Sequence, residues 1–346
     1  MRVLIVGAGA IGRFMAARLK LAGHNAVLLA RPDGAAQLAA GFTFAADGKQ
    51  YKIAVPVATA PDDAALHDPF ELAVMAVKSF STPGAIESVR AVSACERATI
   101  LTLQNGIGNE ELCAAAFGDE RVVAGALTTA VDKAADGSIV ASSKGGLSIA
   151  PLGKLPHNWL LAVFENSAIK VAAAPDWRAL KWSKLCINLQ ANAVCAVLDW
   201  TPEQVYADKT AFSIERRCLL EAFAVMSALG ITPIALIDFP VPLLIAAART
   251  LPEAMLRPVL ASRVAKARGG KLPSLLIDAR AHRPRTEVDV LNGAVAERAA
   301  AAGVAAPANA AVARILNGIT DGSIDWDTFR AKPAALAAKI DGALAP

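Results

Sequence analysis

Three polar side chains recur at intervals of four residues in an otherwise apolar part of the chain. Lys184, Asn188 and Asn192 stand at i, i+4 and i+8, so a continuous helix would place all three on one face. Polar side chains stacked along an apolar helix are costly unless they meet a ligand or each other. An ammonium in such a place can act as a general acid, donating a proton to an oxygen on which negative charge develops. The alternative is a structural polar ladder between helices.

A second candidate site is a glycine-rich turn near the N-terminus. It follows the apolar run at residues 2–6 and opens a helical pattern that closes at Gly23. This order of strand, glycine turn and helix is the one that holds a dinucleotide, because the helix N-terminus offers N–H groups and a positive dipole end to phosphates. A chance glycine turn is the alternative. The turn consists of Gly7, Ala8, Gly9, Ala10, Ile11 and Gly12.

Each of the three glycines of this turn has its own expected task. Gly7 permits the tight turn off the strand, and Gly9 lets the backbone approach a pyrophosphate without an intervening side chain. Gly12 lets the helix pack closely on the sheet.

The residue that ends the second apolar run indicates which dinucleotide would bind. An acidic residue there would bond the ribose 2′-hydroxyl of NAD, but this chain has Arg31, followed by Pro32. A guanidinium suits a 2′-phosphate, so the sequence favours NADP. Asp33, two residues later, is the competing candidate for a hydrogen bond to the ribose. Arg31 can also be an ordinary solvated charge.

Two more polar residues stand where apolar runs end. Lys78 follows the run at residues 72–77, and Asn105 stands between the run at 98–103 and two glycines. In open α/β sheets, ligands bind at the carboxyl ends of the strands. We therefore expect Lys78 to meet a cofactor phosphate or ribose, and Asn105 to bond a cofactor ribose or a substrate hydroxyl. Either residue can instead be a strand-end cap.

The C-terminal half supplies two weaker candidates. Ser274 lies four residues before Asp278 and could bond a carboxylate. Glu287 could orient a lysine or accept a hydrogen bond from a substrate hydroxyl. It could equally be a first-turn glutamate that the helix dipole stabilises, with Thr286 as a cap.

The elements that must position these residues change character near residue 175. Before it, strands alternate with helices, which predicts a doubly wound, mostly parallel sheet. After it, helical patterns dominate, and Asp176 is a plausible N-cap for a helix at 177–198. The expected class is α/β plus all-α, with domains at 1–174 and 175–346. The predicted strands lie at 70–77, 98–103, 121–129 and 138–149, a hairpin at 42–57 around Asp47-Gly48, and helices at 35–40, from 83, at 219–229 and at 286–302.

Composition and charge limit the classes of protein to which this chain can belong. The chain has 346 residues, 55% of them hydrophobic and 19% charged, so it suits two domains with a large core. The net charge of +4 is modest and forms no basic cluster with aromatics, so nucleic acid is a poor partner. The stretch at 231–248 is too broken by proline to be a membrane span, and Met1 leads straight into a strand with no room for a signal peptide.

Cysteine and histidine usage fits a reducing compartment without a metal centre. The five cysteines are an odd number and form no CxxC pair, so we expect buried free thiols and a cytoplasmic protein. The four histidines are scattered and show no metal-ligand spacing.

Taken together, these motifs resemble the ketopantoate reductases (2-dehydropantoate 2-reductases) over about residues 1–318. The lysine–asparagine–asparagine helix in WSKLCINLQAN and the TEVDVLNG segment are the most specific matches. The glycine loop is common to many enzymes. The other matching residues are Arg31, Lys78 in AVKSF, Asn105 in LQNGIG, and Ser274.

This resemblance implies NADPH-dependent reduction of 2-dehydropantoate to (R)-pantoate, in pantothenate and coenzyme A biosynthesis. It implies a Rossmann-type domain followed by a helical domain like the C-terminal domain of 6-phosphogluconate dehydrogenase, which could form a homodimer. Lys184 would be the proton donor, with Glu287 as its catalytic partner. Asn105, Asn188, Asn192, Ser274 and Glu287 would hold the substrate and the cofactor ribose.

The sequence departs from the family pattern in the substrate half. Gln104 stands where a histidine often precedes the asparagine, Ala193 replaces a frequent proline, and Ile277 stands where a glutamine commonly precedes Asp278. One extra residue separates Asp278 from Glu287, and the stretch at 232–271 is longer than usual. These changes bear on the substrate more than on the reaction.

Two alternatives remain open. A relative that reduces a different 2-oxo or β-keto acid would keep the same motifs. A non-catalytic NADP-binding redox sensor would need the cofactor loop but neither Lys184 nor Glu287, so the presence of both argues against it. A purely structural protein would not need the polar helix face at all.

Overall fold

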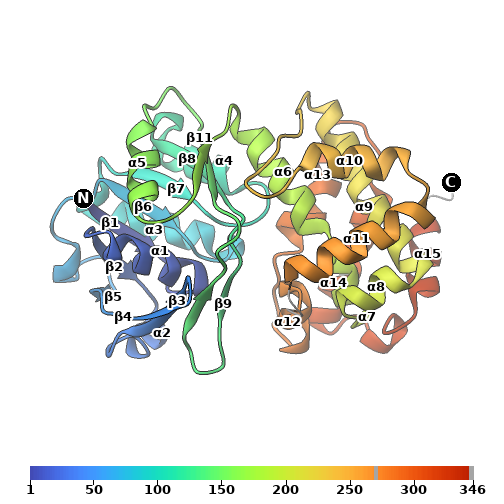
Figure 1. Ribbon diagram of the computed structural model, residues 1–346, viewed down its shortest axis with the longest axis horizontal. Helices are drawn as coiled ribbons and strands as arrows, with labels where there is room; N and C mark the ends of the chain where they lie inside the picture. The colour runs from blue at the N-terminus through green and yellow to red at the C-terminus, as the bar shows by residue number, and fades with distance from the viewer. Residues whose placement is uncertain (269–271, 343–346) are drawn as a thin grey trace. The chain divides into compact units, whose positions relative to one another are not determined.

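The computed structural model describes residues 1–268 and 272–342 (Figure 1). These form two compact units. The first comprises Met1–Gln104, Gly108–Lys181 and Leu236–Phe239, and the second comprises Asn105–Ile107, Trp182–Ala235 and the described residues from Pro240 onward. The division falls inside one helix, whereas the sequence suggested a boundary between residues 174 and 175.

The first unit is built on an eight-stranded sheet in the order β12-β11-β8-β7-β6-β1-β2-β5. Every neighbouring pair is parallel except β8 and β11. The prediction of a doubly wound, mostly parallel sheet is therefore confirmed. The strands are β1 (Arg2–Val6), β2 (Asn25–Leu29), β5 (Val57–Ala58), β6 (Leu72–Met75), β7 (Thr99–Thr102), β8 (Val122–Leu127), β11 (Leu147–Pro151) and β12 (Val171–Ala173).

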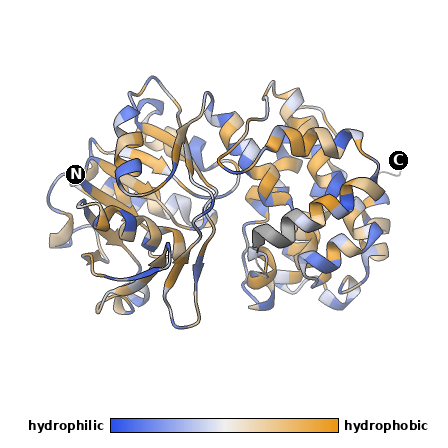
Figure 2. Cartoon of the chain, in the orientation of Figure 1, coloured by the Kyte–Doolittle hydropathy of each residue, from blue (hydrophilic) through white to orange (hydrophobic). Residues whose placement is uncertain are grey.

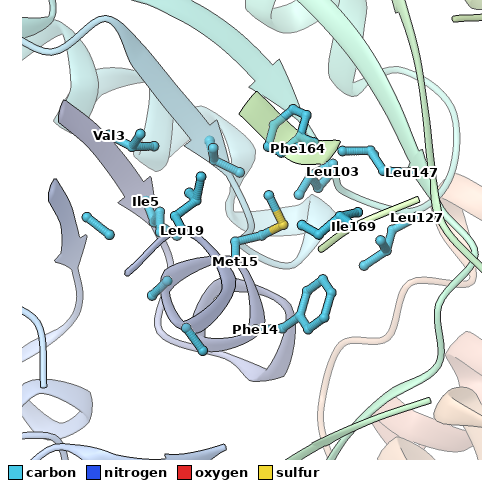
Figure 3. Packing of buried hydrophobic residues seen from close by; sticks show 14 of the residues in the cluster. Val3, Ile5, Phe14, Met15, Leu19, Leu103, Leu127, Leu147, Phe164 and Ile169 are labelled. Atoms are coloured by element: carbon cyan, nitrogen blue, oxygen red, sulfur yellow. The ribbon is translucent and has the colours of Figure 1, made fainter. Parts of the chain in front are cut away.

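Apolar side chains alternate between the two faces of this sheet, because successive strand residues point to opposite sides. Val3 and Ile5 pack with the helix that follows the glycine loop (Figure 3), whereas Leu4 and Val6 pack on the opposite face. Hydrophobic colouring accordingly dominates the strands in Figure 2. The helices of this unit are α1 (Ala10–Leu21), α2 (Pro32–Ala36), α3 (Thr82–Ala91), α4 (Asn109–Phe117) and α5 (Asn158–Asn166).

A second, four-stranded sheet has the order β4-β3-β10-β9. The predicted hairpin is confirmed: β3 (Phe42–Ala46) pairs antiparallel with β4 (Lys49–Ile53), and Asp47 and Gly48 both have positive φ. The other two strands are β9 (Val131–Lys133) and β10 (Ile139–Ala141).

Two of the predicted elements in the first unit are wrong in extent. The strand expected at 138–149 is divided between the two sheets as β10 and β11, because Gly145 at φ +85° turns the chain out of extended structure. The helix expected at 35–40 is instead α2, which begins at Pro32 and ends in a turn. Proline favours this earlier start because its fixed φ suits the first helical position.

The second unit is helical and begins within α6, whose first residues belong to the first unit. Asp176 caps α6 as predicted, accepting a hydrogen bond from the Ala179 amide at 2.6 Å. None of the described helices is both long and apolar enough to cross a membrane. The helices are α6 (Trp177–Leu189), α7 (Ala193–Leu198), α8 (Pro202–Ala207), α9 (Lys209–Ala228), α10 (Val241–Thr250), α11 (Glu253–Arg268), α12 (Ser274–Arg280), α13 (Ala294–Ala301), α14 (Pro307–Asp321) and α15 (Pro333–Asp341).

Two of these helices differ from the predictions. The pattern at 219–229 belongs to the longer helix α9, which begins after Asp208, a residue whose carboxylate caps it. The helix expected at 286–302 begins later, as the π-helical turn η5 (Asp289–Gly293) that leads into α13. Short 3₁₀ turns complete the described chain: η1 (Ala64–Leu66), η2 (Ser79–Ser81), η3 (Ser93–Cys95), η4 (Asp119–Arg121) and η6 (Trp326–Thr328).

Candidate active site

The glycine loop joins β1 to α1 with a conformation that needs glycine at two positions. Gly7 has φ +110°, and a Cβ built on it would lie 2.9 Å from the carbonyl oxygen of Ala76. A Cβ on Gly12 would overlap the Gly7 carbonyl oxygen, so this residue lets the first turn of α1 close on the loop itself as well as on the sheet. A Cβ on Gly9 would meet no described atom within 4 Å, so the backbone there is open to a ligand.

The N-terminus of α1 is suited to an anion. Within the described chain no side chain caps it, and its first turn holds no acidic residue. The N–H groups and the positive dipole end can therefore serve a bound phosphate. This open cradle fits the pyrophosphate of a dinucleotide.

Arg13, in the first turn of α1, is a residue that the sequence analysis missed. Its guanidinium is buried, and Nε donates to the carbonyl oxygen of Ala8 at 2.8 Å, which fixes the loop from within. Burial lowers the pKa of this guanidinium. The sequence did contain an indication of this role, because an arginine in the first turn of a helix next to a glycine loop can donate to the carbonyl groups of that loop.

Arg31 and Lys78 lie at the same edge of the sheet as the glycine loop, because β2, β1 and β6 are neighbours in the parallel order. Arg31 is exposed and precedes the first residue of α2. Lys78 is half-buried and precedes η2, two residues after Ala76, the residue that borders Gly7. Three groups with affinity for phosphate therefore share one edge of the first unit.

The expectation that Lys184, Asn188 and Asn192 share one continuous helix is wrong. Helix α6 ends at Leu189, Ala191 adopts φ +48°, and α7 starts after Asn192. The carboxylate of Glu215 accepts a hydrogen bond from the Ala191 amide at 2.7 Å and so stabilises the break. Lys184 and Asn188 do lie one turn apart on α6.

Hydrogen bonds nevertheless connect the predicted amides. Asn188 Nδ2 donates to Asn105 Oδ1 at 3.2 Å, and Asn192 Nδ2 donates to the Asn188 carbonyl oxygen at 3.0 Å. The Asn192 Oδ1 atom in turn accepts from the Leu275 amide at 3.2 Å. Exposed Ser274 is the neighbour of Leu275 and the first residue of α12. Four of the predicted residues are thus brought into one neighbourhood.

The segment that carries Glu287 meets the same turn as Asn105. The Ile107 amide donates to the Val290 carbonyl oxygen at 3.0 Å. A Cβ on Gly106, which has φ +83°, would overlap that same oxygen, so the close approach requires glycine. Glu287 is only 5% exposed, whereas Lys184 is half-buried. A half-buried ammonium beside amide groups can stabilise a developing alkoxide and supply its proton.

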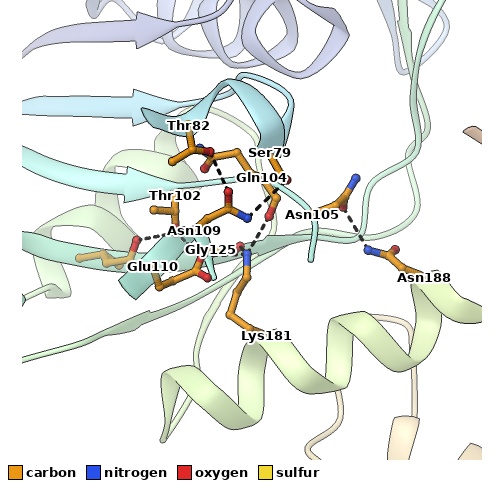
Figure 4. Close-up of polar contacts among 11 residues, drawn as sticks. Ser79, Thr82, Thr102, Gln104, Asn105, Asn109, Glu110, Gly125, Lys181 and Asn188 are labelled. Carbon is orange, nitrogen blue, oxygen red and sulfur yellow. Dashed lines mark hydrogen bonds and ion pairs between the residues drawn. The ribbon is translucent and has the colours of Figure 1, made fainter. Parts of the chain in front are cut away.

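A buried polar network that the sequence analysis did not anticipate lies beside this turn (Figure 4). The Lys181 ammonium is 2.9 Å from Glu110 Oε1, with side chains only 2% and 1% exposed. Thr102 Oγ1 donates to the same carboxylate oxygen at 2.6 Å. The signal was present in the sequence, since Lys181 is three residues before Lys184 and so lies on nearly the same helical face.

The side chain of Gln104, one of the departures from the family pattern, belongs to this network. It is 4% exposed, and Nε2 donates to Thr82 Oγ1 at 3.2 Å. Thr82 in turn donates to Asn109 Oδ1 at 2.7 Å. Gln104 therefore ties the end of β7 to the start of α3. No group of His, Cys, Asp and Glu side chains among the described residues has the arrangement of a metal site.

The fold and these residues define a class: a Rossmann-type nucleotide-binding unit joined to a helical unit with a lysine–asparagine site. Comparison with known sequences makes the family specific. Residues 3–154 match the family described as ketopantoate reductase PanE/ApbA, and residues 176–320 match its C-terminal domain. The chain belongs to the ketopantoate reductase family, a family of oxidoreductases.

Individual relatives agree with this assignment. A 2-dehydropantoate 2-reductase from Archaeoglobus fulgidus is 23% identical over 324 residues, which cover 93% of this chain and 98% of that one. A PanE/ApbA family ketopantoate reductase from Ralstonia eutropha JMP134 superposes with a TM-score of 0.76 at 26% identity, covering 93% and 99% of the two chains. A D-mandelate dehydrogenase solved with NADH and anilino(oxo)acetate has a TM-score of 0.78 at 21% identity and the same coverage, which shows a shared fold.

Proposed function

We propose that this protein reduces a 2-oxoacid to a 2-hydroxyacid with NADPH, and that the acid is 2-dehydropantoate, giving (R)-pantoate for coenzyme A biosynthesis. The family membership and the relatives named 2-dehydropantoate 2-reductase support this assignment. The observation that carries it is the hydrogen-bonded series from Asn105 through Asn188 to Asn192, which runs beside Lys184 on α6.

The first unit would hold the cofactor. When bound, NADPH supplies the hydride. The open backbone at Gly9 and the N-terminus of α1 would receive the pyrophosphate. Arg31 would bond the 2′-phosphate, and Lys78 would meet a phosphate or ribose at the same edge.

Lys184 would donate the proton that completes the reduction. Hydride addition to the C2 carbonyl carbon breaks the π bond and leaves its electron pair on oxygen, so a proton must reach that oxygen. The ammonium stabilises this charge and transfers its proton to form the hydroxyl. Glu287 would keep the lysine aligned and charged. Asn105, Asn188, Asn192 and Ser274 would orient the hydroxyl and carboxylate of the substrate.

A different 2-oxoacid is the second candidate substrate. The D-mandelate dehydrogenase named above shares the fold, and this chain departs from the family pattern at Ala193, Ile277 and residues 232–271. A phenyl-substituted 2-oxoacid is therefore the natural competitor.

The test is NADPH oxidation by the purified protein with 2-dehydropantoate, phenylglyoxylate and pyruvate in parallel. The highest kcat/KM with 2-dehydropantoate is the expected result. If another 2-oxoacid gives the highest kcat/KM, the substrate assignment is wrong, but the reaction class is still correct. NADPH binding without turnover of any of them would instead favour the redox sensor.

A further inference from the structure

Lys181 is the buried cation nearest in sequence to Lys184, and its three N–H donors all have partners. Besides Glu110 Oε1 at 2.9 Å, Nζ lies 2.7 Å from the Gln104 carbonyl oxygen and 3.4 Å from the Gly125 carbonyl oxygen. An ammonium has only three donors to give. It therefore joins three elements at one point: the start of α4, the end of β7 and strand β8.

The contact with Gln104 bears on the proposed active site because of where that carbonyl lies. It belongs to the peptide group that joins Gln104 to Asn105, and a peptide group is planar. Fixing its oxygen therefore fixes the direction in which the chain enters Asn105. Asn105 then accepts a hydrogen bond from Asn188, which lies on the same helix as Lys181.

We call residues 104–108 the Asn105 turn. Helix α6 contacts this turn through Lys181 and Asn188, which lie two helical turns apart on the helix. Figure 4 shows Lys181 and Asn188 reaching the turn from the same side of α6. Lys184 lies between them, because positions i, i+3 and i+7 share a helical face. The two contacts set the register between the helix that carries the proton donor and the turn that carries Asn105.

We infer that Lys181, with Glu110 as its counter-ion, is a positioning residue that sets the Asn105 turn against α6 so that Asn105 and Lys184 act on one substrate. The role of Glu110 is to make the buried ammonium tolerable. It is the second residue of α4, where the helix dipole favours a carboxylate, and it accepts from Thr102 as well.

The expected change in kcat rests on the proposed function. The experiment therefore also measures amide hydrogen exchange, which does not depend on that function. The variant is Lys181→Met with Glu110→Gln, which removes the ammonium without leaving an uncompensated buried carboxylate. We expect kcat to fall about tenfold, because misplacement of a catalytic group is costly. The NADPH Kd should change less than kcat, since the glycine loop, Arg31 and Lys78 are not altered. Amide hydrogen exchange at residues 105–108 should become faster.

Arg121→Met is the matched control. Arg121 also donates to backbone carbonyl oxygens next to β7, those of Cys95 at 2.8 Å and Ala98 at 2.9 Å, but at the opposite end of the strand. This change should lower Tm while leaving kcat and the exchange at 105–108 as they are. A purely structural role for Lys181 predicts that both variants lose Tm alone.

Glu110→Gln alone is the second variant. It leaves the buried ammonium without its counter-ion, so the Tm should fall, and a loss of kcat should be accompanied by faster exchange at residues 105–108. The inference is overturned if a folded double variant keeps wild-type kcat and exchange, or if Glu110→Gln loses kcat with its turn still protected. If the wild type reduces no 2-oxoacid, the proposed function fails, and the exchange comparison still decides whether Lys181 holds the turn.

Discussion

Lys184 is half-buried on α6, one turn before an asparagine that bonds Asn105. If it donates the proton, Lys184→Ala should lower kcat by roughly 10²–10⁴-fold, the range for a general acid. The Kd for NADPH should hardly change, since the lysine belongs to the substrate step. Steady-state kinetics with cofactor titration measures both, and exposed Lys339→Ala on α15 is the control that should match wild type. Full activity of Lys184→Ala on every substrate that the wild type accepts would make the lysine structural.

Arg31 is exposed at the sheet edge that also carries the glycine loop. If it reads the 2′-phosphate, Arg31→Ala should weaken NADPH by about 1.5–3 kcal/mol, the value of a hydrogen bond to a charged group, and leave NADH nearly unaffected. Comparing KM for the two cofactors tests this. Asp33→Ala is the matched control, and it should weaken NADH only if Asp33 is the reader instead. A wild type without preference would show that neither residue discriminates.

The close packing of the glycine loop against the first turn of α1 can be tested by substitution. Gly12→Ala would push a methyl group against the Gly7 carbonyl oxygen, so the loop must open and NADPH binding should fall sharply. Gly84→Ala is the matched control, because a Cβ in that helix meets nothing within 4 Å. It should raise stability by about 0.5–1 kcal/mol and leave cofactor affinity alone. Thermal unfolding together with cofactor titration separates the two effects, and equal cofactor affinity in both variants would contradict the packing argument.

Elements whose turns or ends are encoded by neighbouring residues were predicted correctly from the sequence. Elements whose ends depend on contacts with residues far along the chain were not. The hairpin was predictable because Asp47-Gly48 encodes its own turn. The break between α6 and α7 was not, because the Leu189–Ala193 stretch has no proline or glycine and the break is stabilised by Glu215, far along the chain. The same holds for the Lys181 site, whose partners Glu110 and Gly125 come from other elements.

The whole molecule contains five free cysteines, and all of them are buried. Burial raises the pKa of Cys95, Cys113 and Cys186 to about 12, and that of Cys218 well above its ordinary value. These thiols stay protonated in the folded chain while they ionise near pH 8.5 in the unfolded one. Above that pH the unfolded chain binds fewer protons than the folded chain, so the free energy of unfolding falls as pH rises.

The expected loss is up to about 1.4 kcal/mol per pH unit for each thiol, present between about pH 9 and pH 11 and absent below about pH 8. Urea unfolding across this range measures it. Other groups also titrate there, so the sharper comparison is with Cys186→Ala, whose side chain is fully buried in α6. That variant should be less stable than wild type at pH 8, because it leaves a cavity, yet lose stability less steeply towards pH 11. Parallel pH profiles for the two proteins would show that the Cys186 thiol ionises as readily inside the fold as outside it.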